Sequence, residues 1–148
     1  MTLLNMKYRA TPKLIWFWLK SQGTAEMPRL TIAGELGLAT NTIRTNLATL
    51  MKRGYVQELS PRTHLPGKVG ATARVLVAVG DYTVLPLPRL PDDVKKLTPA
   101  AKLVWLYLAN ATALGIMGYQ QRDVAKELGL SELLVSFAFK QLRRINAI

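Results

Sequence analysis

The stretch IAGELGLATNTIRTNLATLMKRGYV, residues Ile32 to Val56, determines the expected fold of the chain. Its first apolar residues recur at helical spacing and predict a short helix with one buried face: Ile32, Ala33 and Leu36. Gly37 predicts the end of that helix, because the residue after a helix commonly adopts a positive φ, which glycine tolerates best. The stretch therefore begins with a short helix and a tight turn.

A second, longer helix is predicted after the turn. Its apolar residues stand at i, i+4 and i+7 and leave a polar face opposite: Ile43, Leu47 and Leu50. Gly54 predicts the end of this helix, and Tyr55 and Val56 begin an extended segment. Two helices joined by a short glycine turn and followed by a hairpin resemble the winged helix-turn-helix superfamily.

The residues after Gly54 predict a two-stranded wing. Tyr55–Leu59 alternates weakly, and Ala73–Val79 (ARVLVAV) is rich in β-branched residues, which is typical of a strand. The segment between them carries glycines and basic residues, so a basic loop is expected at the tip of the hairpin. Through the resemblance, this arrangement implies a protein that inserts its second helix into a DNA major groove.

A further helix is predicted before this stretch. The segment KLIWFWLK follows Thr11 and Pro12, which are expected to be the N-cap and the first helical residue. Trp16 and Phe17 are interpreted as core residues, because aromatic residues at helical spacing are more often buried than functional. Residues 24–30 are expected to form a loop that leads into the helix-turn-helix.

The second half of the chain repeats the first. KLVW at 102–105 matches KLIW at 13–16, and VAKELGL at 124–130 matches IAGELGL at 32–38. The core positions of the longer helix are also apolar in the second copy: Val135, Phe139 and Leu142. Asn146 stands at the position of the glycine that ends this helix, and asparagine is the next most tolerant residue of positive φ. The chain is therefore interpreted as two tandem winged-helix units.

The predicted fold class is mainly α with a small antiparallel β-wing, an α+β arrangement of two tandem units. Residues 1–80 are expected to form the first winged helix-turn-helix, and the Pro-rich segment 81–96 a semi-rigid linker. Residues 97–148 are expected to form a second unit that lacks most of its wing. This second unit resembles the start of helix-turn-helix domains in phage and plasmid replication proteins, where a helix of the pattern TP..KLV..YLA precedes the motif.

The composition favours a polyanionic partner. The 148 residues include 20 Lys and Arg against 9 Asp and Glu, a formal net charge of +11, and the excess is concentrated in residues 1–80. Such an excess favours nucleic acid first and an anionic membrane surface second. The absence of cysteine excludes disulfides, thiolate zinc sites and cysteine nucleophiles. Because neither a membrane-spanning apolar run nor a signal peptide is recognisable, a cytoplasmic protein without membrane contact is expected.

The polar face of the helix after Gly37 is the predicted DNA-reading surface. Its short polar residues and one arginine suit base edges and phosphates, since Asn pairs with adenine and Arg with guanine in the major groove. Basic residues near the helix end and in the wing would extend this surface along the DNA backbone. The predicted DNA-binding residues are Thr40, Asn41, Thr42, Arg44, Thr45, Lys52, Arg53, Arg62, Lys68 and Arg74. The alternative is an ordinary solvated face.

The equivalent face of the second copy is apolar. Leu133, Leu134 and Phe137 stand where the first copy has polar residues. Because an apolar face reads DNA poorly, these residues are predicted to contact protein, either in the same chain, in a second copy or in a partner. The alternative is that they enlarge the core of their own unit. The second unit is thus predicted to be a degenerate helix-turn-helix used for packing or dimerisation.

The functional prediction is sequence-specific binding of double-stranded DNA, foremost as a transcriptional regulator. One alternative is a replication initiator or conjugation accessory protein of a plasmid or phage, and another is a protein–protein adaptor that uses the helix-turn-helix surfaces. No enzyme, metal or cofactor is expected, because the sequence has no glycine-rich phosphate loop, no metal-ligand spacing and a single histidine, His64. Asp92 and Asp93 follow a proline and are interpreted as acids at the start of a helix, where negative charge is favoured.

Overall fold

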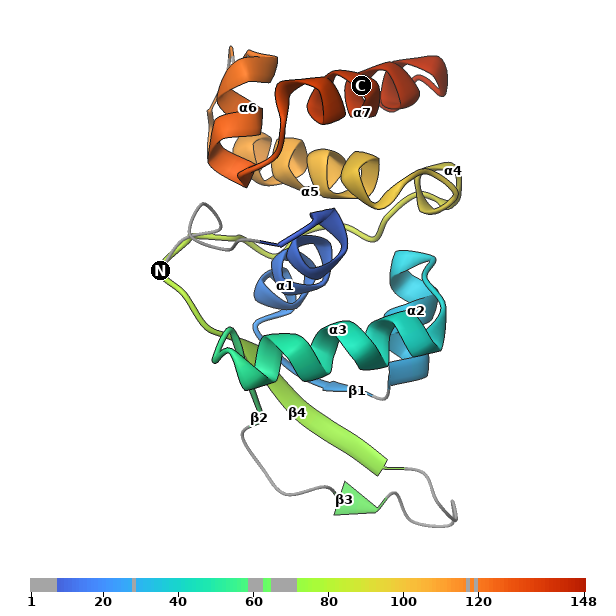
Figure 1. Cartoon of the computed structure of the whole chain (residues 1–148), viewed down its shortest axis with the longest axis vertical. Coiled ribbons are helices and arrows are strands. Elements are labelled where there is room, and N and C mark those ends of the chain that lie inside the picture. Colours follow the sequence, from blue (N-terminus) through green and yellow to red (C-terminus); the bar gives the residue numbers. More distant parts are fainter. Residues whose placement is uncertain (1–7, 28, 59–62, 65–71, 117, 119) are drawn as a thin grey trace.

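The computed structural model describes residues 8–27, 29–58, 63–64, 72–116, 118 and 120–148. This part of the chain is mainly helical and carries a small antiparallel sheet (Figure 1). The helices are α1 (Ala10–Gln22), α2 (Arg29–Leu36), α3 (Thr40–Lys52), α4 (Asp92–Lys95), α5 (Pro99–Ala113), α6 (Gln121–Leu128) and α7 (Glu132–Arg144). The strands are β1 (Thr24–Met27), β2 (Val56–Glu58), β3 (Thr63–His64) and β4 (Thr72–Ala78).

β4 is the central strand of the sheet. It pairs antiparallel with β1 on one side and with β2 on the other, so that Leu76 stands opposite both Ala25 and Glu58. β3 pairs with the beginning of β4. α1 packs against β4 and α3 against β2, and the side chains of Leu76 and Ala78 are buried. The two strands predicted on either side of the basic loop are therefore present and belong to the core.

Residues 24–30 do not form the predicted loop. Thr24–Met27 form β1, and Arg29 begins α2. Alanine and glutamate have a weak preference for strands, so the local sequence does not explain the extended conformation. The segment is extended because it pairs with β4, whose edge would otherwise be open. The partner strand lies far along the chain, and for that reason a local sequence pattern did not reveal the pairing.

The first helix begins earlier than predicted. α1 starts at Ala10, and the residue before it makes no side-chain capping bond, so the prediction that Thr11 is the N-cap is wrong. Pro12 fits inside the first turn because the first four backbone N–H positions have no intrahelical acceptor. In α5, by contrast, Thr98 is the N-cap, accepts a hydrogen bond from a first-turn N–H, and is followed by Pro99 as the first helical residue.

α5, α6 and α7 repeat the order of α1, α2 and α3. α2 and α6 each contain 8 residues, and α3 and α7 each contain 13. The core positions predicted for the longer helix are buried in both copies: Ile43, Leu47, Leu50, Val135, Phe139 and Leu142. Gly54 has a φ of 80° and Asn146 a φ of 56°, so the helix-ending turn also has the same handedness in both copies.

The two halves share one continuous hydrophobic core. α1 packs directly against α5 in the middle of the molecule, with α3 on one side of this pair and α7 on the other (Figure 1). Trp16 and Phe17 are fully buried, which confirms their interpretation as core residues. Packing between α1 and α5 thus joins the two halves along the faces of their first helices.

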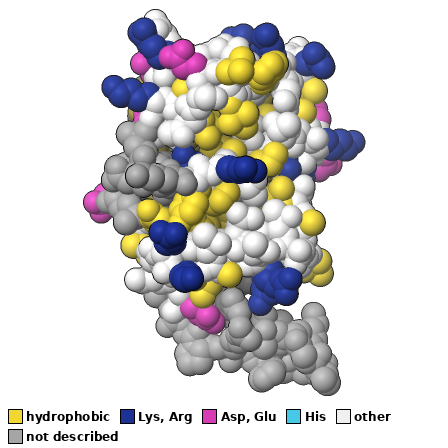
Figure 2. All heavy atoms as spheres, viewed as in Figure 1, with side chains coloured by type: hydrophobic (Ala, Val, Ile, Leu, Met, Phe, Trp, Pro, Cys, Tyr) yellow, Lys and Arg dark blue, Asp and Glu magenta, His cyan; other side chains and the backbone are white. Residues whose placement is uncertain are grey.

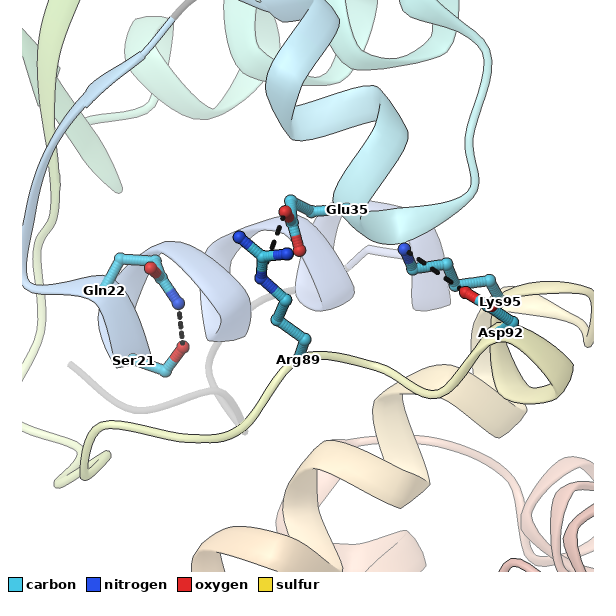
Figure 3. Close-up of polar contacts among 6 residues, drawn as sticks. All are labelled: Ser21, Gln22, Glu35, Arg89, Asp92 and Lys95. Atoms are coloured by element: carbon cyan, nitrogen blue, oxygen red, sulfur yellow. Dashed lines mark hydrogen bonds and ion pairs between the residues drawn. The ribbon is translucent and has the colours of Figure 1, made fainter.

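The Pro-rich segment 81–96 is packed against the protein along its length. The side chains of Leu90 and Val94 are buried in the shared core. Arg89 Nε lies 3.6 Å from Glu35 Oε1, and this ion pair ties the segment to α2 (Figure 3). The segment therefore holds the two halves in one arrangement, in addition to connecting them.

α4 ends this segment beside the end of α2. Asp92 and Asp93 occupy its first turn as expected, and Asp92 Oδ1 lies 4.0 Å from Lys95 Nζ (Figure 3). Gly37, which has a φ of 63°, lies so close to α4 that a Cβ atom added there would be 2.6 Å from the Lys95 carbonyl oxygen. The glycine that ends α2 is therefore required by its φ and also by the close approach of α4.

A buried lysine of the first half binds the end of a helix in the second half. Lys13 Nζ, on α1, donates hydrogen bonds to the carbonyl oxygens of Leu128 and Gly129, at 2.8 and 3.0 Å. These carbonyls are at the C-terminal end of α6, where a helix leaves acceptors unpaired and favours a positive charge. Lys13 therefore caps α6 from the opposite half of the molecule.

The second half returns the same contact. Lys102 Nζ, on α5, donates to the carbonyl oxygens of Leu36 and Gly37 at the end of α2, at 2.8 and 3.1 Å. Both lysine side chains are almost fully buried, and burial lowers the pKa of each ammonium group. Each half thus caps a helix of the other through an equivalent lysine, as the two subunits of a symmetric dimer would.

Candidate nucleic-acid interface

α3 presents the predicted reading face to solvent. Its apolar stripe points into the core, so the opposite face is left outside. The exposed residues of this face are Thr40, Asn41, Arg44, Thr45 and Ala48, and Thr42 is half-buried. Lys52 in the last turn and Arg53 directly after it are exposed as well. The structure therefore brings seven of the predicted DNA-binding residues together on and beside one helix.

Two of these residues contact each other. The guanidinium of Arg44 donates a hydrogen bond to Asn41 Oδ1, one helical turn earlier. The hydroxyl of Thr45 donates to the backbone carbonyl of Asn41 at 2.9 Å. The first of these contacts holds the arginine and the asparagine side chains side by side on the exposed surface. A ligand with both donor and acceptor groups, such as a base edge, can replace them.

The N-terminal end of α3 has no side-chain cap. Its N-cap residue is Ala39, whereas the equivalent residue of α7, Ser131, accepts a hydrogen bond from the Leu134 N–H at 3.1 Å. The first-turn N–H groups of α3 are therefore without a side-chain acceptor at the cap. Such an end favours an anion, because free N–H groups and the helix dipole both attract negative charge.

The predicted wing residues are only partly described. Arg74 lies in β4, in register with Met27 of β1, and Arg62 and Lys68 lie outside the described residues. β2 follows α3 along the chain and packs against it, and β4 pairs with β2 (Figure 1). The hairpin therefore joins the helix that carries the candidate reading face through β2.

The outer face of α7 is apolar and open to solvent. Leu133 is 68% exposed, Leu134 38% and Phe137 51%. None of the three belongs to the buried core, so the alternative that they enlarge the core of their own half is wrong. Lys140 Nζ lies 5.6 Å from the centroid of the Phe137 ring.

The two candidate faces point to different sides of the molecule. α3 and α7 are separated by the α1–α5 pair (Figure 1). Figure 2 shows Lys and Arg side chains spread over the visible face, with hydrophobic side chains gathered among them. A partner on α3 and a partner on α7 could therefore bind at the same time.

A third polar feature was not recognised in the sequence. Glu127 accepts hydrogen bonds from the hydroxyls of Tyr82 and Tyr107, each at 2.9 Å, beside a small pocket of about 190 Å³. Burial and the nearby Glu127 carboxylate raise the pKa of Tyr82, so this phenol remains a donor at neutral pH. Since Tyr82 belongs to the Pro-rich segment and Glu127 to α6, no sequence spacing indicated the cluster. Its hydrogen bonds fix the segment to the second half.

No protein-family model, curated protein or solved structure matches this chain. Among the described residues, no His, Asp and Glu side chains gather in a group that could hold a metal ion. None of the helices in that part has the length and apolar character that a bilayer span requires.

Proposed function

We propose that this protein binds double-stranded DNA sequence-specifically and acts as a transcriptional regulator. The observation that carries the proposal is the exposed face of α3, with Asn41 and Arg44 side by side and a basic end. In this proposal α2, the turn at Gly37 and α3 are a helix-turn-helix, and β2 and β4 are strands of its wing. The first half is then a winged-helix unit, and α5, α6 and α7 of the second half repeat its three helices.

The chemistry of the α3 face suits a major groove. A guanidinium can donate two hydrogen bonds to guanine, and an amide can pair with adenine through one donor and one acceptor. The small neighbours Thr45 and Ala48 permit the helix to approach the base edges closely. Lys52 and Arg53 add positive charge at the end of α3 for contacts with phosphates.

Selection of bound duplexes from a random pool, followed by footprinting, tests the proposal. With the selected duplex, Arg44→Ala and Asn41→Ala are each expected to weaken binding by roughly 5- to 100-fold, the cost of one specific base contact. The double variant Arg143→Ala with Arg144→Ala removes two exposed cations from the end of α7 and serves as the control, with affinity expected to stay near wild type. Affinity should also fall steeply with salt, because phosphate contacts release counterions.

The opposite result would reassign the reading helix. If the α3 variants bind as wild type while the α7 variant does not bind, the second copy reads DNA. If no duplex binds in a salt-dependent way, the adaptor alternative replaces DNA binding. The footprint also separates the two DNA-binding roles: a site upstream of the protein's own gene supports the regulator, and repeated sites at a replication or transfer origin support the plasmid or phage protein.

The exposed face of α7 supports a second part of the proposal, that two copies dimerise through Leu133, Leu134 and Phe137. Large apolar side chains this exposed are typical of a contact surface. Because α3 lies on the other side of the core, the two reading helices would lie at the outer ends of such a dimer, each on its own half-site.

Sedimentation velocity of Phe137→Glu tests the dimer. The substitution places an unpaired carboxylate inside the proposed contact surface. Burying this charge is costly, so the variant is expected to be a monomer at micromolar concentration where the wild type is a dimer. Lys126→Glu, at an exposed position of α6, is the matched control and should sediment as wild type. If Phe137→Glu and the wild type sediment alike, dimerisation through this face is excluded.

A further inference from the structure

Glu35 and Glu127 stand at the same position of α2 and α6, one residue before the leucine that ends each helix, but their partners differ. In the first half, Glu35 pairs with Arg89, whose Nε lies 3.6 Å from the carboxylate (Figure 3). In the second half, Glu127 is half-buried and forms no ion pair with a lysine or arginine of the described residues. The repeat therefore contains one glutamate with a cation and one without.

Two phenols take the place of the cation at Glu127. Tyr82 of the Pro-rich segment and Tyr107 of α5 each donate their hydroxyl proton to one carboxylate oxygen, at 2.9 Å. Each hydroxyl has a single hydrogen, so both are used in these bonds. Neutral donors leave the formal charge of the carboxylate uncompensated, and each of its oxygens can accept a further hydrogen bond. The cluster can therefore bind an additional donor.

A pocket of about 190 Å³ includes this cluster in its wall. Beside the carboxylate and the two phenols, the wall has an apolar part made by Ala111, Leu114 and Ile116. All wall residues lie between 82 and 127 and are described in the structure, so neither end of the sequence contributes to the pocket. The pocket thus combines an uncompensated carboxylate with an apolar surface.

The polar groups that line the pocket are mainly acceptors. Asn110 is engaged with the backbone, because its amide nitrogen donates to the Thr83 carbonyl at 3.0 Å and its oxygen accepts from the Leu85 N–H at 2.9 Å. The phenol and carboxylate oxygens have free lone pairs, whereas the phenol hydrogens are already shared. A ligand must therefore bring donors, and a positive charge on it would also compensate the charge of Glu127.

We propose that this pocket, here called the Glu127 pocket, binds a small primary ammonium that carries a short apolar chain. The ammonium donates to the Glu127 carboxylate and to a phenol oxygen, and it takes the role that Arg89 has at Glu35. The chain lies against the apolar part of the wall. A volume of about 190 Å³ equals that of roughly six water molecules, so the ligand is a free amine of about six non-hydrogen atoms.

Isothermal titration calorimetry of the full chain with butylammonium chloride tests the proposal. A ligand of this size is expected to bind with a dissociation constant of roughly 0.1–1 mM. 1-Butanol has the same chain without a charge, and butyrate carries the opposite charge, so each should bind at least roughly 10-fold more weakly. The pocket is lined by neither the α3 face nor the exposed apolar residues of α7. The measurement therefore needs no DNA, and its failure would leave the proposed function untouched.

Two variants on α6 separate the pocket from diffuse attraction of cations. Glu127→Gln keeps the size of the side chain and removes its charge, and it should weaken butylammonium binding roughly 10-fold or more, the loss of a charge-assisted hydrogen bond. Asp123→Asn is the matched control, because it removes the same charge at an exposed position of the same helix, outside the pocket wall. It should bind butylammonium as wild type. Thermal melting checks that both variants are folded.

A third variant tests the apolar wall without disturbing the core. Ile116 is 51% exposed, so Ile116→Ala should leave the fold intact and weaken butylammonium binding roughly 2- to 5-fold through lost apolar contact. If butylammonium does not bind, or if Glu127→Gln binds it as well as wild type or Asp123→Asn loses as much, the proposal is wrong. If N-acetyl-lysine methylamide binds more tightly than butylammonium, the ammonium belongs to a lysine of a partner protein, and the assignment to a free amine is wrong.

Discussion

Replacing Lys102 or Lys13 by methionine is expected to lower the free energy of unfolding by about 2–4 kcal/mol in each case. Each ammonium makes two hydrogen bonds to helix-end carbonyls of the opposite half, and methionine retains the packing of the stem but donates nothing. The carbonyls are left inside the protein without their donor, and a buried acceptor without a partner is costly. Urea unfolding followed by circular dichroism measures the loss.

The control for this pair is Lys126→Met. Lys126 is exposed on α6, the helix whose end Lys13 caps, and its replacement should change stability by less than about 0.5 kcal/mol. If the Lys13 and Lys102 variants are as stable as the control, the cost of burying each ammonium cancels its hydrogen bonds. The reciprocal lysines would then specify how the halves meet without stabilising the fold.

The pH dependence of the same variants gives a second measurement. Burial lowers the pKa of both lysines below the ordinary value of 10.5, so the unfolded chain binds protons more tightly than the folded one. This contribution to stability is fully present above pH 10.5 and is lost as the pH falls through the lowered pKa. The difference in unfolding free energy between wild type and either methionine variant should therefore be larger at pH 10.5 than at pH 7.

Gly37→Ala is expected to destabilise the protein by about 2–5 kcal/mol, as the sum of a backbone and a packing cost. The residue has a φ of 63°, where an alanine is strained. Its Cβ would also lie 2.6 Å from the Lys95 carbonyl oxygen and 3.3 Å from Lys102 Nζ. The main-chain oxygen cannot move without shifting α4, so the change should disturb both α4 and the lysine contact. Denaturant unfolding measures it.

Gly54→Ala isolates the backbone part of this cost. Gly54 has a φ of 80°, but a Cβ there would meet no atom within 4 Å. The variant should therefore lose only about 1–2 kcal/mol, the strain of a left-handed residue. If Gly37→Ala and Gly54→Ala lose the same amount, α4 yields easily to the new methyl group. The close approach at Gly37 would then contribute little to the position of α4.

Local pattern predicted the helical part of the fold well. The apolar stripe of α3 and its counterpart on α7 are buried as expected, and Asn146 adopts the positive φ that its glycine counterpart suggested. These features were predictable because helix hydrogen bonds and helical periodicity involve residues a few positions apart. The exposure of Asn41 and Arg44 follows from the same periodicity, since it leaves them opposite the buried stripe.

Features that depend on distant segments were missed or misplaced. β1 was interpreted as part of a loop because its extended conformation comes from pairing with β4. The Thr11-Pro12 pair predicts a helix that begins at Pro12, whereas α1 begins at Ala10, one residue before Thr11. The Tyr82, Tyr107 and Glu127 cluster joins a Pro-rich segment to two helices, and no spacing in the chain indicates it.

The sequence by itself determined that the chain holds two related helical halves and which face of each long helix is buried. Tertiary structure alone decided how those halves meet, since α1 packs on α5 and Lys13 and Lys102 each bind a helix end of the opposite half. It also decided that Glu35 pairs with a cation, whereas Glu127 at the same position of the repeat accepts hydrogen bonds from two tyrosine hydroxyls beside a pocket. The physical reason is the sequence separation of the interacting residues. Periodicity depends on residues a few positions apart in one helix, whereas burial and helix capping depend on which distant segment packs against that helix.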